Sequence, residues 1–140
     1  MVEKYSSRSP EDTARIAGEL AKTLEGGEVI AFSGGLGAGK TCFTAALARA
    51  LGYGGNVSSP TFALVNEYRG GKLDIFHFDM YRVTGWEDLY STGFFDYLNE
   101  GGVTAVEWSE NIAAALPEGT IRVDIAVTGE TEREITVSRE

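Results

Sequence analysis

The sequence has only one cysteine and one histidine in 140 residues. A single cysteine excludes a disulfide within the chain and is typical of a protein from a reducing compartment. One histidine and one cysteine are also too few for a zinc site. No apolar run approaches the length needed to cross a membrane, and the first ten residues lack the apolar segment of a signal peptide. We therefore expect a cytoplasmic protein with no membrane partner.

Basic residues are scarce as well. The chain has 12 Lys and Arg against 21 Asp and Glu, which gives a net charge of −9. Such a surface repels the phosphate backbone of nucleic acids, so we do not expect tight binding to nucleic acid by this chain alone. The length predicts a single domain over residues 1–140, and a hydrophobic content of 43% is enough for an ordinary buried core.

Glycine is abundant, and a glycine-rich stretch forms the best-defined motif, Gly34-Gly35-Leu36-Gly37-Ala38-Gly39-Lys40-Thr41. It matches the P-loop pattern G-x-x-x-x-G-K-[ST]. Residues 28–33 before it are mostly apolar and predict a strand. Residues 41–51 after it have apolar side chains at helical spacing and end at Gly52, which predicts a helix. The motif therefore lies between a strand and a helix, as a phosphate-binding loop requires.

The residue types of this motif define its chemistry. Glycines let the backbone turn tightly and direct several N–H groups toward phosphate oxygens, and the helix adds its positive N-terminal end. Lys40 is predicted to reach the β- and γ-phosphates of a nucleotide, and the Thr41 hydroxyl is predicted to bind Mg²⁺.

The remaining pattern predicts the elements around this loop. A helix is expected to begin at Ser9-Pro10 and to end at Gly26-Gly27. Further elements are expected in this order: a hairpin of strands 62–68 and 73–78, short helices within 83–102, a strand at 103–106, a short helix at 112–116, and a hairpin of strands 121–127 and 134–137. These elements predict a three-layer α/β P-loop domain, with a mixed, mainly parallel central sheet and antiparallel hairpins.

Two acidic residues follow predicted strands and are candidates for the same site. Glu107 follows the strand at 103–106 and is predicted to serve Mg²⁺ opposite Thr41. Asp79 follows the strand at 73–78 and is a candidate to orient the attacking water or to support the Mg²⁺ shell. Asp79 as a turn cap is the competing interpretation. Thr61, in the loop after the P-loop helix, is a candidate γ-phosphate sensor, although turn chemistry after Pro60 explains it nearly as well.

Two further residues have simpler interpretations. His77 shares a strand face with Asp79 by two-residue alternation, and a buried structural histidine is favoured over a general base. Cys42 lies in the first turn of the P-loop helix, where packing is the preferred interpretation of its presence.

Four motifs taken together resemble one family. Residues 34–41, Ser59-Pro60-Thr61-Phe62, residues 77–82 (His-Phe-Asp-Met-Tyr-Arg) and Glu107-Trp108 occur in that order. This combination resembles the bacterial TsaE (YjeE) family of small P-loop ATPases over essentially the whole chain. The P-loop is shared by many families, whereas the combination of the other three motifs is far more specific.

The resemblance implies a function and assigns residues to it. It implies ATP hydrolysis with Mg²⁺ in the biosynthesis of N6-threonylcarbamoyladenosine at position 37 of tRNA, with TsaD and TsaB as protein partners and tRNA reached only through their complex. It implies that Lys40 and Thr41 contact phosphate and Mg²⁺, that Glu107 is the Mg²⁺ acid and that Asp79 is the essential aspartate. The remaining implied contacts are Thr61 in a switch-like loop, Trp108 beside the nucleotide and Arg133 near the base. Cys42 departs from the family, in which a second Thr is common, and a thiol is a weaker partner for the α-phosphate.

Three other functions are known for chains with a P-loop or a nucleotide site, and the sequence bears on each of them. A GTPase commonly carries Asp-x-x-Gly and Asn-Lys-x-Asp, and here no Asp is followed three residues later by Gly. A small-molecule kinase needs basic side chains for its phosphates, and residues 83–121 contain no Lys, Arg or His. A binding module that uses the nucleotide only as a switch, without significant turnover, stays open as an alternative.

Overall fold

Strands and helices alternate along most of the chain. The structure is a computed structural model, and it describes residues 2–35, 38–60 and 64–139. In these ranges the strands are β1 (Val2–Ser7), β2 (Val29–Ser33), β3 (Val65–Tyr68), β4 (Ile75–Asp79), β5 (Val103–Glu107), β6 (Ile121–Val127) and β7 (Arg133–Arg139). The helices are α1 (Pro10–Ala21), α2 (Lys40–Ala50), α3 (Trp86–Ser91), α4 (Phe94–Leu98) and the 3-10 helix η1 (Ser109–Ala115).

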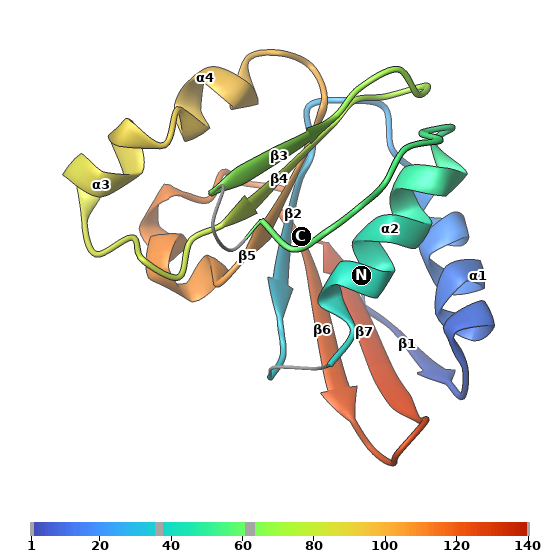
Figure 1. Cartoon of the computed structure of the whole chain (residues 1–140). Helices are drawn as coiled ribbons and strands as arrows, with labels where there is room; N and C mark the ends of the chain where they lie inside the picture. Colours follow the sequence, from blue (N-terminus) through green and yellow to red (C-terminus); the bar gives the residue numbers. More distant parts are fainter. Residues whose placement is uncertain (1, 36–37, 61–63, 140) are drawn as a thin grey trace.

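The strands join in one sheet with the order β1-β7-β6-β2-β5-β4-β3 (Figure 1). The central strands β6, β2, β5 and β4 are parallel to one another. At the two edges, β3 pairs antiparallel with β4, and β7 lies antiparallel between β6 and β1. This arrangement confirms the predicted mixed, mainly parallel central sheet with antiparallel hairpins.

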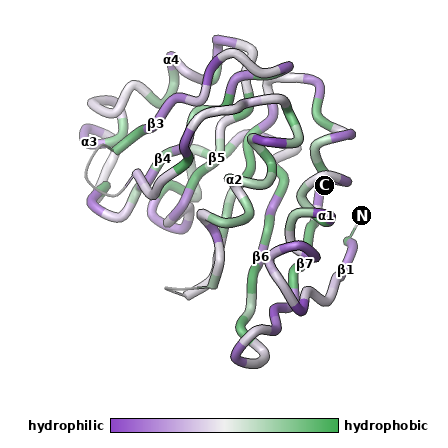
Figure 2. Tube along the Cα trace, turned by 45° about the vertical axis from the view of Figure 1, so that its right-hand side comes forward, coloured by the Kyte–Doolittle hydropathy of each residue, from purple (hydrophilic) through white to green (hydrophobic). Residues whose placement is uncertain are grey.

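Helices cover both faces of the sheet and create two apolar cores. On one face, α1 and α2 bury Ile16, Phe43 and Leu47 against side chains such as Phe32 of β2. On the other face, α3, α4 and η1 enclose a second core; it includes Phe76, Phe78, Leu89, Phe94 and Ile112. Figure 2 shows hydrophobic residues mainly along the middle of the sheet and hydrophilic ones mainly in the outer turns. The three predicted layers are therefore present.

The N-terminal strand is an addition to the predicted elements. Residues 2–7 pair along their length with β7, with Tyr5 opposite Ile135. The segment has only two apolar side chains, Val2 and Tyr5, so its own pattern carries little strand signal; β7 supplies the hydrogen bonds that make it a strand. Helix α1 begins as predicted, because the Ser9 side chain accepts a hydrogen bond from the Asp12 amide at 3.1 Å.

Some element boundaries differ from the prediction. Helix α1 ends at Ala21, and turns lead from there to Gly26-Gly27. The helix expected at 112–116 is the 3-10 helix η1, which begins at Ser109. None of the helices in the described ranges is long and apolar enough to cross a membrane.

Candidate active site

The glycine-rich loop leaves the centre of the sheet at the end of β2 and leads into α2. Gly34 has a φ of +140°, and a Cβ at this position would lie 2.5 Å from the carbonyl oxygen of Ile125. Only glycine fits there, both for its backbone conformation and for the close approach of β6. Gly39, with a φ of +104°, precedes the first residue of α2. The predicted contact residues Leu36 and Gly37 lie outside the described residues.

Lys40 is the first residue of α2 and lies over the loop. Its side chain is nearly buried, and its ammonium donates a hydrogen bond to the Gly34 carbonyl at 3.1 Å. The same ammonium lies 5.5 Å from the centre of the Trp108 ring. Within the described ranges no acidic side chain pairs with Lys40. A cation held at a helix N-terminus without an acidic partner is suited to an anionic ligand such as a phosphate.

The two candidate acids lie at neighbouring strand ends. Asp79 of β4 and Glu107 of β5 are partners in the parallel register, and each is only 6% exposed. Asp79 Oδ1 accepts a hydrogen bond from the Tyr81 amide at 2.8 Å, so one of its oxygens caps the turn after β4. The turn-cap interpretation therefore holds for that oxygen. It does not exclude a second role for the carboxylate.

His77 is fully buried, as the structural interpretation predicted. Its Nε2 lies 2.6 Å from Glu107 Oε2, and its Nδ1 lies 3.0 Å from the Tyr68 hydroxyl. The Tyr68 hydroxyl in turn donates to the Ser58 carbonyl at 3.0 Å. Burial raises the pKa of the Tyr68 phenol above its ordinary value, so the hydroxyl keeps its proton at neutral pH. The contacts of His77 with Glu107 and Tyr68 were not predicted from the sequence.

Trp108 follows Glu107 in a strained backbone conformation. Its φ is +57°, a left-handed value that costs a non-glycine residue about 1 kcal/mol or more. The Trp108 ring lies between the Lys40 ammonium, 5.5 Å from its centre, and the Tyr81 ring, whose centre is 4.8 Å away. Strain of this kind is found where a side chain must take one position at a functional site.

Two polar residues of η1 form hydrogen bonds to the backbone near the ends of β4 and β2. The sequence did not predict these contacts. Asn111 donates to the carbonyls of Met80 and Tyr81 at 2.9 and 3.2 Å, which holds the turn after Asp79. Ser109 donates to the Phe32 carbonyl at 3.1 Å, near the end of β2. No local pattern marks these residues, because their partners are about 30 and 77 residues away in the sequence.

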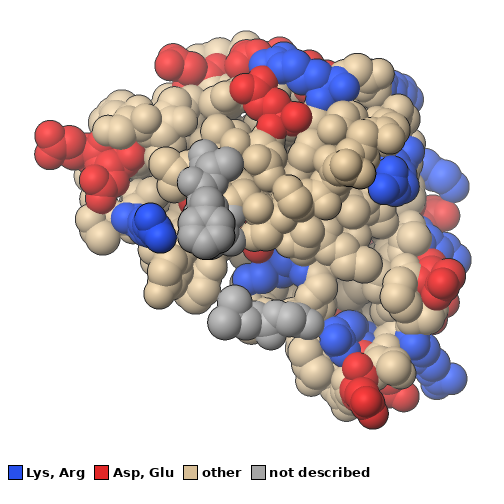
Figure 3. Space-filling view, viewed as in Figure 1, with Lys and Arg blue, Asp and Glu red and all other residues tan. Residues whose placement is uncertain are grey.

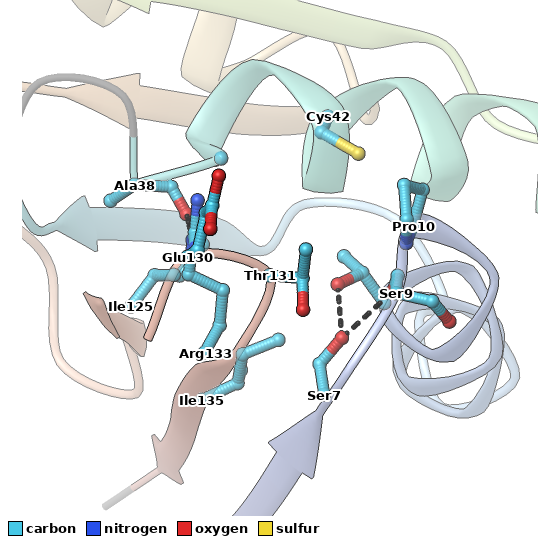
Figure 4. Close-up of a pocket in the computed structure, with 12 residues that line it drawn as sticks. Ser7, Ser9, Pro10, Ala38, Cys42, Ile125, Glu130, Thr131, Arg133 and Ile135 are labelled. Atoms are coloured by element: carbon cyan, nitrogen blue, oxygen red, sulfur yellow. Dashed lines mark hydrogen bonds between the residues drawn. The ribbon is translucent and has the colours of Figure 1, made fainter. Parts of the chain in front are cut away.

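A cavity of about 260 Å³ opens beside the first turn of α2 (Figure 4). Ser7 and Thr13 line one side, with their hydroxyls 2.7 Å apart, and Gly39 and Cys42 belong to α2 and its N-cap. Pockets for drug-sized ligands span roughly 300–1,000 Å³. This cavity is smaller than that range, and it borders the start of the P-loop helix.

Arg133 lies between this cavity and the loop. Its Nε donates to the Ala38 carbonyl at 3.1 Å, and its Nη1 donates to the carbonyls of Gly129 and Glu132 at 3.1 and 2.9 Å. The side chain therefore ties the β6–β7 hairpin to the P-loop while lining the cavity. This position is compatible with the predicted place of Arg133 near a nucleotide base.

The two predicted Mg²⁺ ligands lie on different elements. Thr41 is the second residue of α2, and Glu107 ends β5. In the part of the chain that the structure describes, no group of three or more His, Cys, Asp or Glu side chains gathers to hold a metal alone. Mg²⁺ commonly takes one or two protein oxygens and completes its shell with phosphates and water. Thr61, the candidate phosphate sensor, lies outside the described residues.

Comparison with known proteins gives the family. The model of the family described as "Threonylcarbamoyl adenosine biosynthesis protein TsaE" matches residues 7–135. The TsaE of Treponema pallidum is 41% identical over 94% of this chain and 97% of its own length. The TsaE of Bacillus subtilis is 38% identical over 95% of this chain and 83% of its own length.

A solved structure agrees with these sequence matches. The crystal structure of Bacillus subtilis YdiB superposes with a TM-score of 0.84 at 34% identity, over 99% of this chain and 86% of that one. The fold is therefore that of a P-loop protein, and the chain belongs to the TsaE family of threonylcarbamoyl adenosine biosynthesis proteins.

Proposed function

We propose that this protein binds ATP with Mg²⁺ and hydrolyses it, as an accessory protein that acts with TsaB and TsaD in tRNA threonylcarbamoyladenosine biosynthesis. One observation carries the proposal. The P-loop places Lys40 over the end of β2, and the register of β4 and β5 places Asp79 and Glu107 together at the same edge of the sheet. A cation for phosphate and two acids at one edge are the parts that phosphoryl transfer to water requires.

Each residue of the candidate site has a distinct role in this proposal. Lys40 and the amides at the start of α2 bind the β- and γ-phosphates and stabilise the charge that spreads over them. Thr41 and Glu107 would hold Mg²⁺, which neutralises phosphate charge when bound. Asp79 keeps one oxygen on the Tyr81 amide and uses the carboxylate to orient the attacking water. Trp108 closes one side of the phosphate site.

Cys42 offers a test of how the nucleotide lies. Its side chain is exposed on the first turn of α2 and lines the cavity, so the interpretation of Cys42 as a packing residue is wrong. Replacing it with Thr adds a hydroxyl that donates more strongly to the α-phosphate. A net hydrogen bond contributes roughly 0.5–1.5 kcal/mol, so Cys42→Thr should tighten ATP binding about 2- to 10-fold by calorimetry.

Cys42→Val is the matched control, because valine has the shape of threonine without the hydroxyl. It should leave ATP affinity unchanged or slightly weaker. Equal affinities for the Thr and Val variants would place the α-phosphate away from residue 42.

The acidic charge of this protein indicates that it does not bind tRNA by itself but acts on it through partner proteins. Figure 3 shows acidic side chains gathered over α3, where Glu87 and Asp88 lie, and the whole chain carries a net charge of −9. Binding of tRNA draws mainly on Lys and Arg contacts to phosphate. We therefore expect no gel shift of tRNA with this protein alone at physiological salt, whereas a pull-down with TsaB and TsaD should retain it. Tight binding to bare tRNA without retention of either protein would contradict the proposal.

The activity itself is tested by ATP hydrolysis with and without TsaB and TsaD. We expect slow, Mg²⁺-dependent hydrolysis by the protein alone and faster hydrolysis in the presence of both partners. GTP serves as the control nucleotide. Faster hydrolysis of GTP would favour the GTPase alternative, and binding of ATP without turnover in any mixture would favour a nucleotide-switched binding module.

A further inference from the structure

A buried chain of polar contacts ends on Glu107. A carboxylate can only accept a hydrogen bond, so Nε2–H of His77 donates to Glu107 Oε2, 2.6 Å away. Nδ1 of the same ring lies 3.0 Å from the Tyr68 hydroxyl, and this hydroxyl lies 3.0 Å from the Ser58 carbonyl. The imidazole is thus held at both nitrogens and cannot rotate without breaking a buried contact.

The surroundings make this chain rigid. His77 is 0% exposed, Tyr68 is 3% exposed and Glu107 is 6% exposed, so water does not compete for these bonds. The Tyr68 ring also packs against Tyr53, with ring centres 5.2 Å apart. A carboxylate with one oxygen fixed in this way has few orientations left for its second oxygen. Side chains that orient a metal ligand in this manner affect metal affinity although they do not touch the metal.

We propose that His77 is a positioning residue that orients the Glu107 carboxylate toward the Mg²⁺ of the nucleotide, and that Tyr68 fixes His77 by anchoring it to the Ser58 carbonyl. This inference rests on the proposed function, because it assumes a metal–nucleotide complex at Glu107. It assigns to the only histidine a purpose beyond packing. It also links the metal acid to the Ser58 carbonyl, in the segment between α2 and β3.

The test measures the Mg²⁺ concentration needed for half-maximal ATP binding. Trp108, next to Glu107, is the reporter, and Trp86→Phe in every protein removes the only other tryptophan fluorescence. His77→Asn keeps a polar atom near Nδ1 but loses the contact with Glu107, and it should raise the Mg²⁺ requirement about 10-fold. His77→Gln keeps a donor near Nε2 and should stay within about 3-fold of the parent protein.

Tyr68→Phe tests the outer contact with less disturbance of the core. Removing its hydroxyl should raise the Mg²⁺ requirement by about 3- to 10-fold. Tyr53→Phe is the matched control, because Tyr53 packs against the same ring, and within the described residues its hydroxyl bonds to the exposed Asn56 carbonyl and to neither His77 nor Ser58. This control should leave the Mg²⁺ requirement unchanged.

Two comparisons separate positioning from general damage to the fold. ATP binding in EDTA should be equal in the parent and variant proteins, because only the metal-dependent part involves Glu107. In a Glu107→Gln background, Tyr68→Phe should have no further effect, since its action passes through the carboxylate.

Each contrary result has a clear meaning. An unchanged Mg²⁺ requirement in both Tyr68→Phe and His77→Asn, or an equal loss of binding in EDTA, would overturn the inference while leaving the proposed function intact. A parent protein whose ATP binding shows no Mg²⁺ dependence at all would instead overturn the proposed function, and the inference with it.

Discussion

Replacing Lys40 with Ala should abolish ATP hydrolysis and weaken ATP binding about 100-fold or more. Hydrogen bonds from a charged donor contribute roughly 1.5–3 kcal/mol each, and Lys40 is expected to make them to two phosphates. The fold should survive, because the ammonium makes one hydrogen bond, to the Gly34 carbonyl, among the described residues. Calorimetry with ATP and thermal unfolding of the same variant measure the two effects.

Lys72→Ala is the matched control for this experiment. Lys72 is an exposed residue in the turn between β3 and β4. Its loss removes the same charge from the protein without touching the P-loop, so ATP binding should be unchanged. If Lys40→Ala also retained full ATP affinity, the P-loop would not be the nucleotide site.

Substitutions of Glu107 and Asp79 should have different effects, one on Mg²⁺ binding and the other on ATP turnover. If Glu107 serves Mg²⁺, Glu107→Ala should make ATP binding insensitive to Mg²⁺. If Asp79 orients the water, Asp79→Ala should bind ATP with Mg²⁺ normally yet lose turnover by about 100-fold or more. Calorimetry across a range of Mg²⁺ concentrations, together with a hydrolysis assay, distinguishes the two variants.

The two alanine substitutions should also lower the stability of the fold, and amide variants control for this effect. Glu107→Ala leaves Nε2 of His77 without its partner, and Asp79→Ala leaves the Tyr81 amide without its acceptor. A buried polar group without a partner costs about 1–3 kcal/mol. Glu107→Gln and Asp79→Asn keep an acceptor at each position, so they should restore stability without restoring Mg²⁺ dependence or turnover. The opposite pattern, with turnover lost at Glu107 and metal dependence lost at Asp79, would mean that the two roles are exchanged.

Local sequence patterns determined the loop and the elements that flank it. The glycines and Lys40 of the P-loop, the strand before it and the helix after it depend on residues within about 25 positions of one another. The two hairpins are equally local, since their turns and alternating strands are continuous in the sequence. The same holds for the placement of Asp79 and Glu107 at strand ends, because each directly follows an apolar run.

Which of these elements are neighbours in the sheet depends on the tertiary structure alone. The order of the sheet puts β4 beside β5, and this neighbourhood brings His77 within 2.6 Å of Glu107, 30 residues later in the chain. The bond from Arg133 to Ala38 spans 95 residues, and β1 becomes a strand only because β7 offers it an open edge. Propensity and periodicity act over a few turns or one strand. Contacts over such separations depend instead on how the sheet is assembled, which no single stretch of residues encodes.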